Sequence, residues 1–154
     1  MVSSIGIGKD TFWPHLLQGQ SGISEVDAFD TSEHATHYGG QVREFMPENY
    51  IKDQKASTLP RASSMAVAAA SMALDDARFD QNALKGSCRA GVAMGTTAGE
   101  AQEIEEANNI LIKQGHNELK PQTLFNSPVY NINFNVARSF EIEGPNRIFT
   151  TACA

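Results

Sequence analysis

The clearest periodic pattern in the chain lies between Pro60 and Ala77 and predicts a helix. Pro60 suits the first helical position, where its missing N–H has no intrahelical partner to lose. Small apolar side chains then recur at the spacing of one helix face: Ala66, Ala69, Ala70, Ala73, Leu74 and Ala77. Because a stripe of methyl groups buries little area, we expect another backbone to approach this helix closely, as in the middle of a layered domain.

The second half of the chain alternates strand and helix patterns. Residues 89–94 form a short apolar run that predicts a buried strand, followed by a loop bounded by Gly95 and Gly99. Helices are predicted over residues 100–114, ending at Gly115, and over residues 128–140. Residues 147–151 are β-branched and aromatic and predict another strand. This alternation predicts an α/β domain with a largely parallel sheet.

The first third of the chain has a weaker pattern. Asp10 is the expected N-cap of a short helix that ends at Gly19, with two i,i+4 apolar pairs that can pin it to a core. These pairs are Phe12 with Leu16 and Trp13 with Leu17. Glycines, prolines and aspartates punctuate residues 20–58, which predicts loops with one hairpin.

The composition of the chain limits the classes of function that it can have. The 154 residues, 41% hydrophobic and 19% charged, fit one folded domain. A net charge of −6 excludes a general basic footprint for nucleic acid or anionic lipid. No apolar run of about 20 residues is present, so we expect no membrane span. Two cysteines and an N-terminus without a secretory pattern predict a cytoplasmic location.

Three clusters have a chemical and a structural interpretation. The Gly95–Gly99 loop follows a strand, as phosphate-binding loops do, but its spacing favours a tight structural turn. His34 and His37 lie three residues apart but lack an evident third ligand, which favours exposed imidazoles over a metal site. Four carboxylates open the predicted helix that follows the loop, and a solvated face is favoured over acid–base catalysis: Glu100, Glu103, Glu105 and Glu106.

Cys153 follows the last predicted strand and has small residues on both sides. A thiol at a strand-to-helix turn meets unpaired N–H groups, which stabilise the thiolate that attacks thioesters. Free cysteines are nevertheless most often buried and inert, and the local pattern alone favours that interpretation.

A series of sequence blocks in a fixed order resembles the N-terminal half of a β-ketoacyl-acyl-carrier-protein synthase, a condensing enzyme of the thiolase superfamily. The resemblance covers nearly the whole chain. The blocks are Val2-Ser3-Ser4-Ile5-Gly6, Thr11-Phe12-Trp13, Ser21-Gly22-Ile23, Phe29-Asp30, the helix from Arg61 to Ala77, Gly91-Val92-Ala93-Met94-Gly95-Thr96-Thr97, Asn135-Val136-Ala137-Arg138, Gly144-Pro145-Asn146 and Thr151-Ala152-Cys153-Ala154.

The resemblance implies a fold, a reaction and a nucleophile. The fold is the N-terminal half of a thiolase-like αβαβα layered architecture. The reaction is a decarboxylating Claisen condensation of an acyl thioester with malonyl carrier protein, without a cofactor or a metal. Cys153 would accept the acyl group, its backbone N–H would help to form the oxyanion hole, and Ala98 would line the acyl pocket.

The resemblance also implies partners. An acidic acyl carrier protein would meet cations at the mouth of the site, for which Lys52, Lys55 and Arg61 are candidates. Ordinary solubilising charge is an equal interpretation of these three side chains. Family members are usually homodimers.

Departures from the family pattern limit what this chain is expected to do alone. The opening strand of the family is missing, Pro60 and Ala62 replace an Asp and a Phe, and Glu141 stands where Gly is frequent. The sequence stops one residue after Cys153, before the nucleophile helix and the family's two histidines and lysine. We therefore expect residues 1–154 to be an incomplete domain, a fragment that does not condense substrates by itself.

Four histidines are present, and all fall outside the matching blocks: His15, His34, His37 and His116. Two other functions stay open at this point. One is a non-catalytic partner subunit of a condensing synthase, against which Cys153 argues. The other is an unrelated α/β binding domain.

Overall fold

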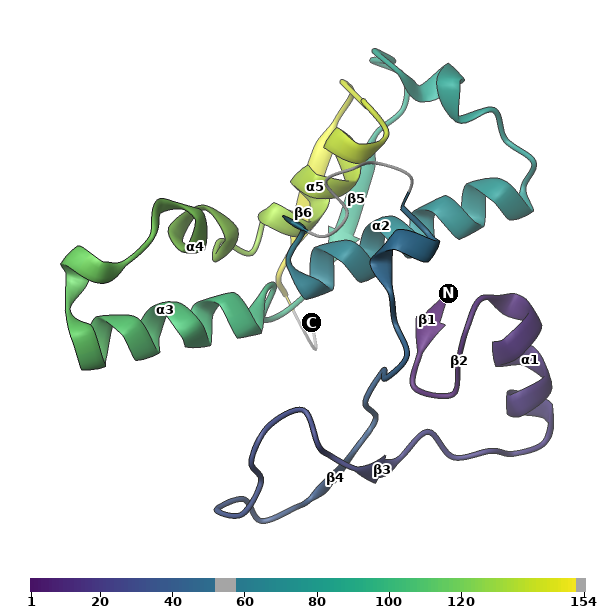
Figure 1. Ribbon diagram of the computed structural model, residues 1–154. Coiled ribbons are helices and arrows are strands. Elements are labelled where there is room, and N and C mark those ends of the chain that lie inside the picture. Colours follow the sequence, from purple (N-terminus) through teal and green to yellow (C-terminus); the bar gives the residue numbers. More distant parts are fainter. Residues whose placement is uncertain (52–57, 152–154) are drawn as a thin grey trace.

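The computed structural model describes residues 1–51 and 58–151. Its helices and strands follow one another along the chain as shown in Figure 1. The α-helices are α1 (Lys9–Leu17), α2 (Arg61–Asp76), α3 (Ala101–Gln114), α4 (Pro121–Asn126) and α5 (Asn131–Ser139). The strands are β1 (Val2–Ser3), β2 (Gly6–Ile7), β3 (Ser24–Glu25), β4 (Tyr38–Gly39), β5 (Val92–Gly95) and β6 (Asn146–Phe149). Short 3-10 turns cover Pro47–Asn49, Gln81–Leu84 and His116–Glu118.

Strands β5 and β6 form a parallel pair, as the alternation of strands and helices predicts. Val92 lies opposite Asn146, and Gly95 lies opposite Phe149. The two other strand pairs within the described residues, β1–β2 and β3–β4, are short and antiparallel. The predicted parallel pairing is therefore confirmed for β5 and β6, while the first third of the chain, for which a helix and loops with one hairpin were predicted, contains the two antiparallel pairs.

Helix α5 packs against both β5 and β6, and α2 packs against α5. The helices α3, α4 and α5 all belong to the connection between the two parallel strands, which makes this region a β–α–β unit. In Figure 1, α3 and α4 extend to one side of the body that α2, α5, β5 and β6 form, and the β3–β4 hairpin extends below it. The hairpin confirms the turn expected within residues 20–58.

Helix α2 confirms the main periodic pattern but not the face that it was expected to bury. Its buried residues are Ser63, Ser64, Val67, Ala68 and Ser71. Ala73 and Ala77 of the predicted stripe are exposed. Alanine fits a buried or an exposed position almost equally well, so small side chains on several faces leave the packing direction undetermined. Pro60 also precedes the helix as its N-cap residue rather than beginning it.

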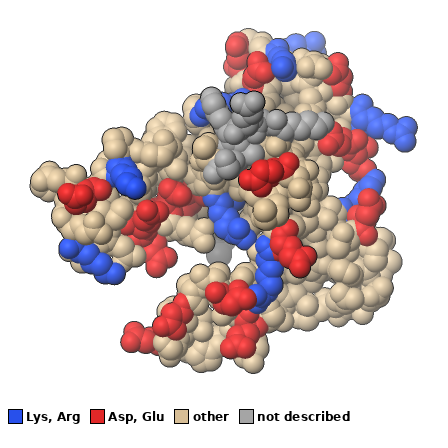
Figure 2. Space-filling view, in the orientation of Figure 1, with Lys and Arg blue, Asp and Glu red and all other residues tan. Residues whose placement is uncertain are grey.

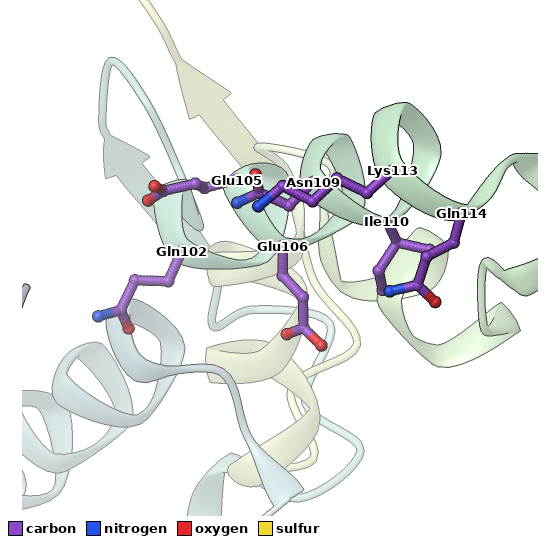
Figure 3. A pocket seen from close by; sticks show the side chains of 7 residues that line it. All are labelled: Gln102, Glu105, Glu106, Asn109, Ile110, Lys113 and Gln114. Carbon is purple, nitrogen blue, oxygen red and sulfur yellow. The ribbon is translucent and has the colours of Figure 1, made fainter.

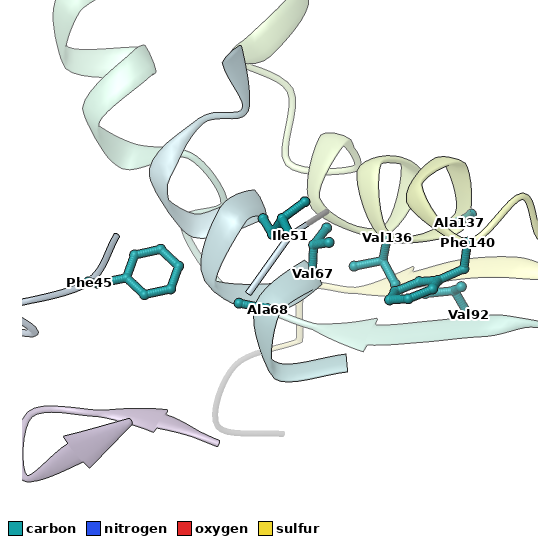
Figure 4. Close-up of a cluster of buried hydrophobic side chains, with 8 residues drawn as sticks. All are labelled: Phe45, Ile51, Val67, Ala68, Val92, Val136, Ala137 and Phe140. Carbon is teal, nitrogen blue, oxygen red and sulfur yellow. The ribbon is translucent and has the colours of Figure 1, made fainter. Parts of the chain in front are cut away.

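The hydrophobic core gathers around α2, β5 and α5. Figure 4 shows Val67 and Ala68 of α2 lying between Phe45 on one side and Val136 on the other. Val67 is 1% exposed and Ala68 is fully buried. The full set is Phe45, Ile51, Val67, Ala68, Val92, Val136, Ala137 and Phe140. The core thus fixes α2 and α5 against the parallel strands.

Helix α1 corrects two expectations. Gly8, with a φ of 80°, is the N-cap residue, and Asp10 lies inside the first turn. Trp13 is 57% and Leu17 69% exposed, and α1 has no buried residue. The i,i+4 pairs therefore do not pin this helix to the core: Phe12 is half-buried, but Trp13, Leu16 and Leu17 are exposed.

The other boundaries differ by a few residues from the predicted ones. The helix expected over residues 128–140 begins at Asn131, and the short α4 before it was not predicted. Gly115 follows α3 as predicted, but its φ of 90° and ψ of 168° are not the left-handed helical conformation expected of a C-terminal glycine; they are an extended conformation with positive φ that glycine alone adopts readily. Within residues 1–51 and 58–151, no helix combines the length and the apolarity that crossing a membrane requires.

Candidate active site

The carboxyl ends of β5 and β6 lie at the same edge of the parallel pair. The backbone N–H of Thr96, the first residue after β5, donates to the carbonyl of Phe149, the last residue of β6, at 3.0 Å. Thr150 and Thr151 are exposed at this edge. In open α/β sheets this edge is where ligands and substrates bind. The loop after β5 and the residues after β6 therefore define the candidate site.

The loop from Gly95 to Gly99 is a tight turn held by its own residues. The N–H of Gly99 donates to Oγ1 of Thr96 at 3.2 Å. Gly99 has a φ of 64°, and a Cβ atom there would lie 2.8 Å from Cα of Val129. Only glycine satisfies both the conformation and the close approach. These contacts support the structural interpretation of the loop over a phosphate-binding one.

Glu100 corrects the expectation that its carboxylate belongs to a solvated helix face. Its side chain is 2% exposed. The backbone N–H of Ser63 donates to Oε1 at 2.7 Å, and that of Ala62 donates to Oε2 at 3.0 Å. Glu105 and Glu106 are exposed as expected, while Glu103 is half-buried and accepts a hydrogen bond from the Asn126 amide. The tertiary contact with α2 was not visible in the local sequence pattern.

Buried asparagines on α5 are functional candidates that sequence reasoning missed. The Asn135 amide donates to Oγ of Ser63 at 2.8 Å, which joins α5 to the first turn of α2. The Asn133 amide donates to Oδ1 of Asn146 at the start of β6, and Oδ1 of Asn133 is buried without a partner among the described residues. The available signal was the spacing of Asn131, Asn133 and Asn135 on a helix next to a strand. Buried amides normally bond to one another or to the backbone.

The structure places two of the five predicted site residues. Ala98 is exposed within the loop after β5. Arg61 begins α2, and its guanidinium donates to the carbonyl of Val42 at 2.5 Å. Cys153, Lys52 and Lys55 lie outside the described residues.

The remaining chemistry-bearing side chains lie away from this edge. His34 packs its ring against Phe29, and His37 contacts Oγ1 of Thr31, both in the loop between β3 and β4. The ring of His15 contacts the carbonyl of Ile5 at 2.5 Å. Cys88 is exposed and free. No group of three or more metal-ligating side chains occurs within the part of the chain that the structure describes.

One surface groove lies on α3, away from the carboxyl ends of β5 and β6. The groove in Figure 3, of about 420 Å³, is lined by seven side chains that all come from α3. A single helix provides no opposing wall, so this groove is open to solvent. Figure 2 shows acidic and basic side chains interspersed on the face in view.

The β–α–β unit, with its loop at the strand ends, places the chain among α/β proteins with a site at the carboxyl edge of parallel strands. The family described as Beta-ketoacyl synthase, N-terminal domain, matches residues 1–154. The chain belongs to this family. The expectation drawn from the sequence blocks is thereby confirmed.

Relatives with assigned names are 3-oxoacyl-[acyl-carrier-protein] synthases. Synthase 2 of Vibrio cholerae is 31% identical over 153 residues, which is 99% of this chain and 37% of the relative. The chloroplastic synthase I of Arabidopsis thaliana is 33% identical over 159 residues, covering 100% of this chain and 33% of the relative. The chain thus spans about a third of the length of these relatives.

Solved structures confirm the thiolase-like fold. The ishigamide ketosynthase/chain length factor superposes with a TM-score of 0.87 at 28% identity, covering 97% of this chain and 38% of that one. A β-ketoacyl synthase from Burkholderia phymatum superposes with a TM-score of 0.75 at 18% identity, over 97% of this chain and 36% of that one. A third match, with a TM-score of 0.72 at 19% identity, is a type II polyketide ketosynthase in complex with its acyl-carrier protein. It covers 97% of this chain and 36% of the ketosynthase complex chain.

Proposed function

We propose that this chain supplies the acyl-accepting nucleophile of a 3-oxoacyl-acyl-carrier-protein synthase, with Cys153 as that nucleophile. The observation that carries the proposal is the shared edge of β5 and β6. Cys153 follows Thr151 by two residues in the sequence, and Thr151 comes directly after β6 and Thr150. Membership in the β-ketoacyl synthase family supports the same assignment.

The proposed reaction begins with transfer of the acyl group. The Cys153 thiolate attacks the carbonyl carbon of an acyl carrier-protein thioester, a new C–S bond forms and the C–S bond to the carrier breaks. The carrier leaves as a thiolate, which takes up the proton that Cys153 lost on ionisation. Malonyl carrier protein then loses CO2, and the resulting carbanion attacks the acyl-enzyme. A C–C bond forms, the bond to Cys153 breaks, and the thiolate is regenerated. The covalent intermediate divides a difficult bond formation into two accessible steps.

Two local features would serve this chemistry. The backbone N–H of Cys153 would donate to the oxyanion that develops on the acyl carbonyl, which is where preorganised donors stabilise most. Ala98 would line the acyl pocket from the loop after β5. A methyl group at position 98 leaves room for a longer or bulkier acyl chain than a large side chain would allow.

Decarboxylation needs groups other than those at this edge. The loops that follow β5 and β6, residues 96–100 and 150–151, contain no histidine or lysine. The family resemblance assigns that role to two histidines and a lysine in its second half. We therefore propose that residues 1–154 alone carry the acylation site but do not complete a condensation. The interpretation of these residues as one incomplete domain, the homodimer and the cytoplasmic location stay predictions.

The partner proposed for this site is an acyl carrier protein. A ketosynthase complex with such a carrier among the similar structures supports this choice. Arg61 is exposed at the start of α2, but its guanidinium already contacts the Val42 carbonyl. Lys52 and Lys55 stay predicted docking residues, and charge reversal at these two positions should raise KM for the carrier.

The test is acylation of Cys153, in the protein expressed from its gene and in residues 1–154 alone. Each is incubated with an acyl carrier-protein thioester or with cerulenin, and adducts are located by peptide mass spectrometry. Cys88→Ser is the matched control, because Cys88 is the other thiol and is exposed. We expect Cys88→Ser to retain the adduct and Cys153→Ser to lose it. An adduct in neither form of the protein would contradict the proposal.

A non-catalytic partner subunit is the second candidate, and one observation favours it. The solved structure with a TM-score of 0.87 is described as a ketosynthase together with a chain length factor. Such a subunit would assemble with a condensing synthase without accepting an acyl group. Loss of synthase assembly, but not of acylation, on mutation of this chain would support the second candidate.

A further inference from the structure

Glu100 provides a cap for a helix to which it does not belong. The first turn of α2 has no side-chain cap of its own, and Pro60 at the N-cap position offers no side-chain acceptor. The two oxygens of Glu100 accept the N–H groups of Ala62 and Ser63 instead, 38 and 37 residues away in sequence. Such N–H groups otherwise lack intrahelical partners, and the helix N-terminus favours a negative charge.

The same residue begins α3. The backbone carbonyl of Glu100 accepts the N–H of Ile104 at 3.1 Å, which is the first hydrogen bond of that helix. Its backbone therefore holds the start of α3 while its side chain holds the start of α2. A buried carboxylate is rare unless it is paired, and here two backbone donors satisfy it.

The loop that carries Ala98 ends at this anchor. At its beginning, the N–H of Thr96 donates to the carbonyl of Phe149 of β6, and its last residue, Gly99, lies against Val129. At its end, the Glu100 side chain is fixed to α2. Ala98 thus lies between one anchor on β6 and another on α2, and its position depends on both.

We propose that Glu100 is a positioning residue for the acyl pocket: its carboxylate, by capping α2, holds the loop that presents Ala98. This inference rests on the proposed function, and it adds a determinant of which acyl chains the site accepts. Glu100 itself does not touch the reacting atoms. It acts by fixing the position of residues 96–99 and by limiting their motion.

A carboxylate suits this position better than an amide of the same shape. Two N–H donors face two oxygens, whereas glutamine offers one oxygen and turns an NH2 group toward the second donor. Glu100→Gln therefore leaves one buried donor without an acceptor while keeping the side-chain volume. Glu105→Gln on the exposed side of α3 is the matched control.

The experiment measures acylation rates of Cys153 with hexanoyl and dodecanoyl thioesters in the protein expressed from its gene. Ala98→Phe, which fills the proposed pocket directly, shows what a change of pocket does to the ratio of the two rates. We expect Glu100→Gln to change that ratio by about tenfold, the low end of what one methylene group is worth in an apolar pocket. Glu105→Gln should leave it unchanged. A merely structural role would lower both rates equally.

Amide hydrogen exchange gives a second measurement, which tests the contacts of Glu100 in the wild type and in Glu100→Gln. In the wild type, the N–H groups of Ala62, Ser63 and Gly99 should be protected and should open together. Glu100→Gln should speed exchange at all three. Unprotected Ala62 and Ser63 amides in the wild type would overturn the inference without any variant.

The outcomes separate the two proposals. If the wild type is acylated normally and Glu100→Gln leaves the ratio of the hexanoyl and dodecanoyl rates unchanged, only the positioning role is overturned. No acylation of the wild type overturns the proposed function, and the positioning role falls with it. A changed ratio together with faster exchange in residues 96–99 supports both.

Discussion

Helices α2 and α3 differ in what surrounds them more than in how regular they are. Helix α2 packs against α5, whose sequence lies more than 50 residues away, and it buries five residues. Helix α3 is amphipathic but contacts mainly α4 and the 3-10 turn that follows it, and none of its residues is buried. Periodicity thus predicts that a helix forms, and a partner distant in sequence decides whether it is covered and on which face.

The free energy of unfolding should change most when a charge is placed at a buried position of α2, and much less when it is placed at an exposed position of α3. Val67 is 1% and Ile112 is 81% exposed. Val67→Asp places an unpaired charge in the core and should lower the free energy of unfolding by about 3–5 kcal/mol. Ile112→Asp should change it by no more than about 0.5 kcal/mol. Urea denaturation followed by circular dichroism measures both, and a similar loss in the two variants would remove the distinction between the helices.

The second test compares the cost of alanine at two glycines, one near the cap of α2 and one at the end of α3. Gly99 and Gly115 both have positive φ, but only Gly99 has a neighbour where a Cβ atom would be placed. Gly99→Ala should destabilise by about 2–4 kcal/mol through backbone strain and the contact with Val129. Gly115→Ala should cost about 1–3 kcal/mol from strain alone, because its φ of 90° and ψ of 168° lie in a region adopted almost only by glycine. Equal thermal shifts would contradict the close packing at Gly99.

The smallest effect concerns the far end of α2, where Asp76 forms an ion pair with Lys9 of α1. The hydrogen bond and charge of Lys9 lower the pKa of Asp76, and the hydrogen bond and charge of Asp76 raise the pKa of Lys9. A lowered carboxyl pKa contributes stability above its ordinary value of about 3.9, and this is lost as pH falls through the folded-state value. The raised Lys9 pKa contributes below its ordinary value of about 10.4 and is lost as pH rises through the folded-state value.

Because both side chains are exposed, the effect should be small and sensitive to salt. Amide protection in α1, corrected for the intrinsic pH dependence of exchange, should be lower near pH 3 than at pH 6, with protection in α3 as the internal reference. Asp76→Asn should abolish this difference. An unchanged pH response in Asp76→Asn would show that the pair does not join α1 to α2.

The sequence predicted the elements whose signals are local. The Ala-rich helix, the strand before Gly95 and the strand after Asn146 all occur close to their expected places. The buried face of α2 was not predictable, because alanine and serine carry little preference and the deciding partner, Asn135, lies 72 residues from Ser63. The role of Glu100 was hidden for the same reason, since a carboxylate at a helix start already has a sufficient local explanation. Family blocks, rather than periodicity, pointed to Cys153 and Ala98, and these assignments stay predictions.

The position of Glu100 at the root of α3 has a mechanical consequence. A helix of 14 residues is about 21 Å long, and α3 starts at Glu100 and packs mainly against α4 and the 3-10 turn that follows it. A force on the far end of α3 therefore acts about 20 Å from the contacts that Glu100 makes with α2. Because Glu100 also ends the turn that bears Ala98, a displacement of α3 would reach that turn through the same residue.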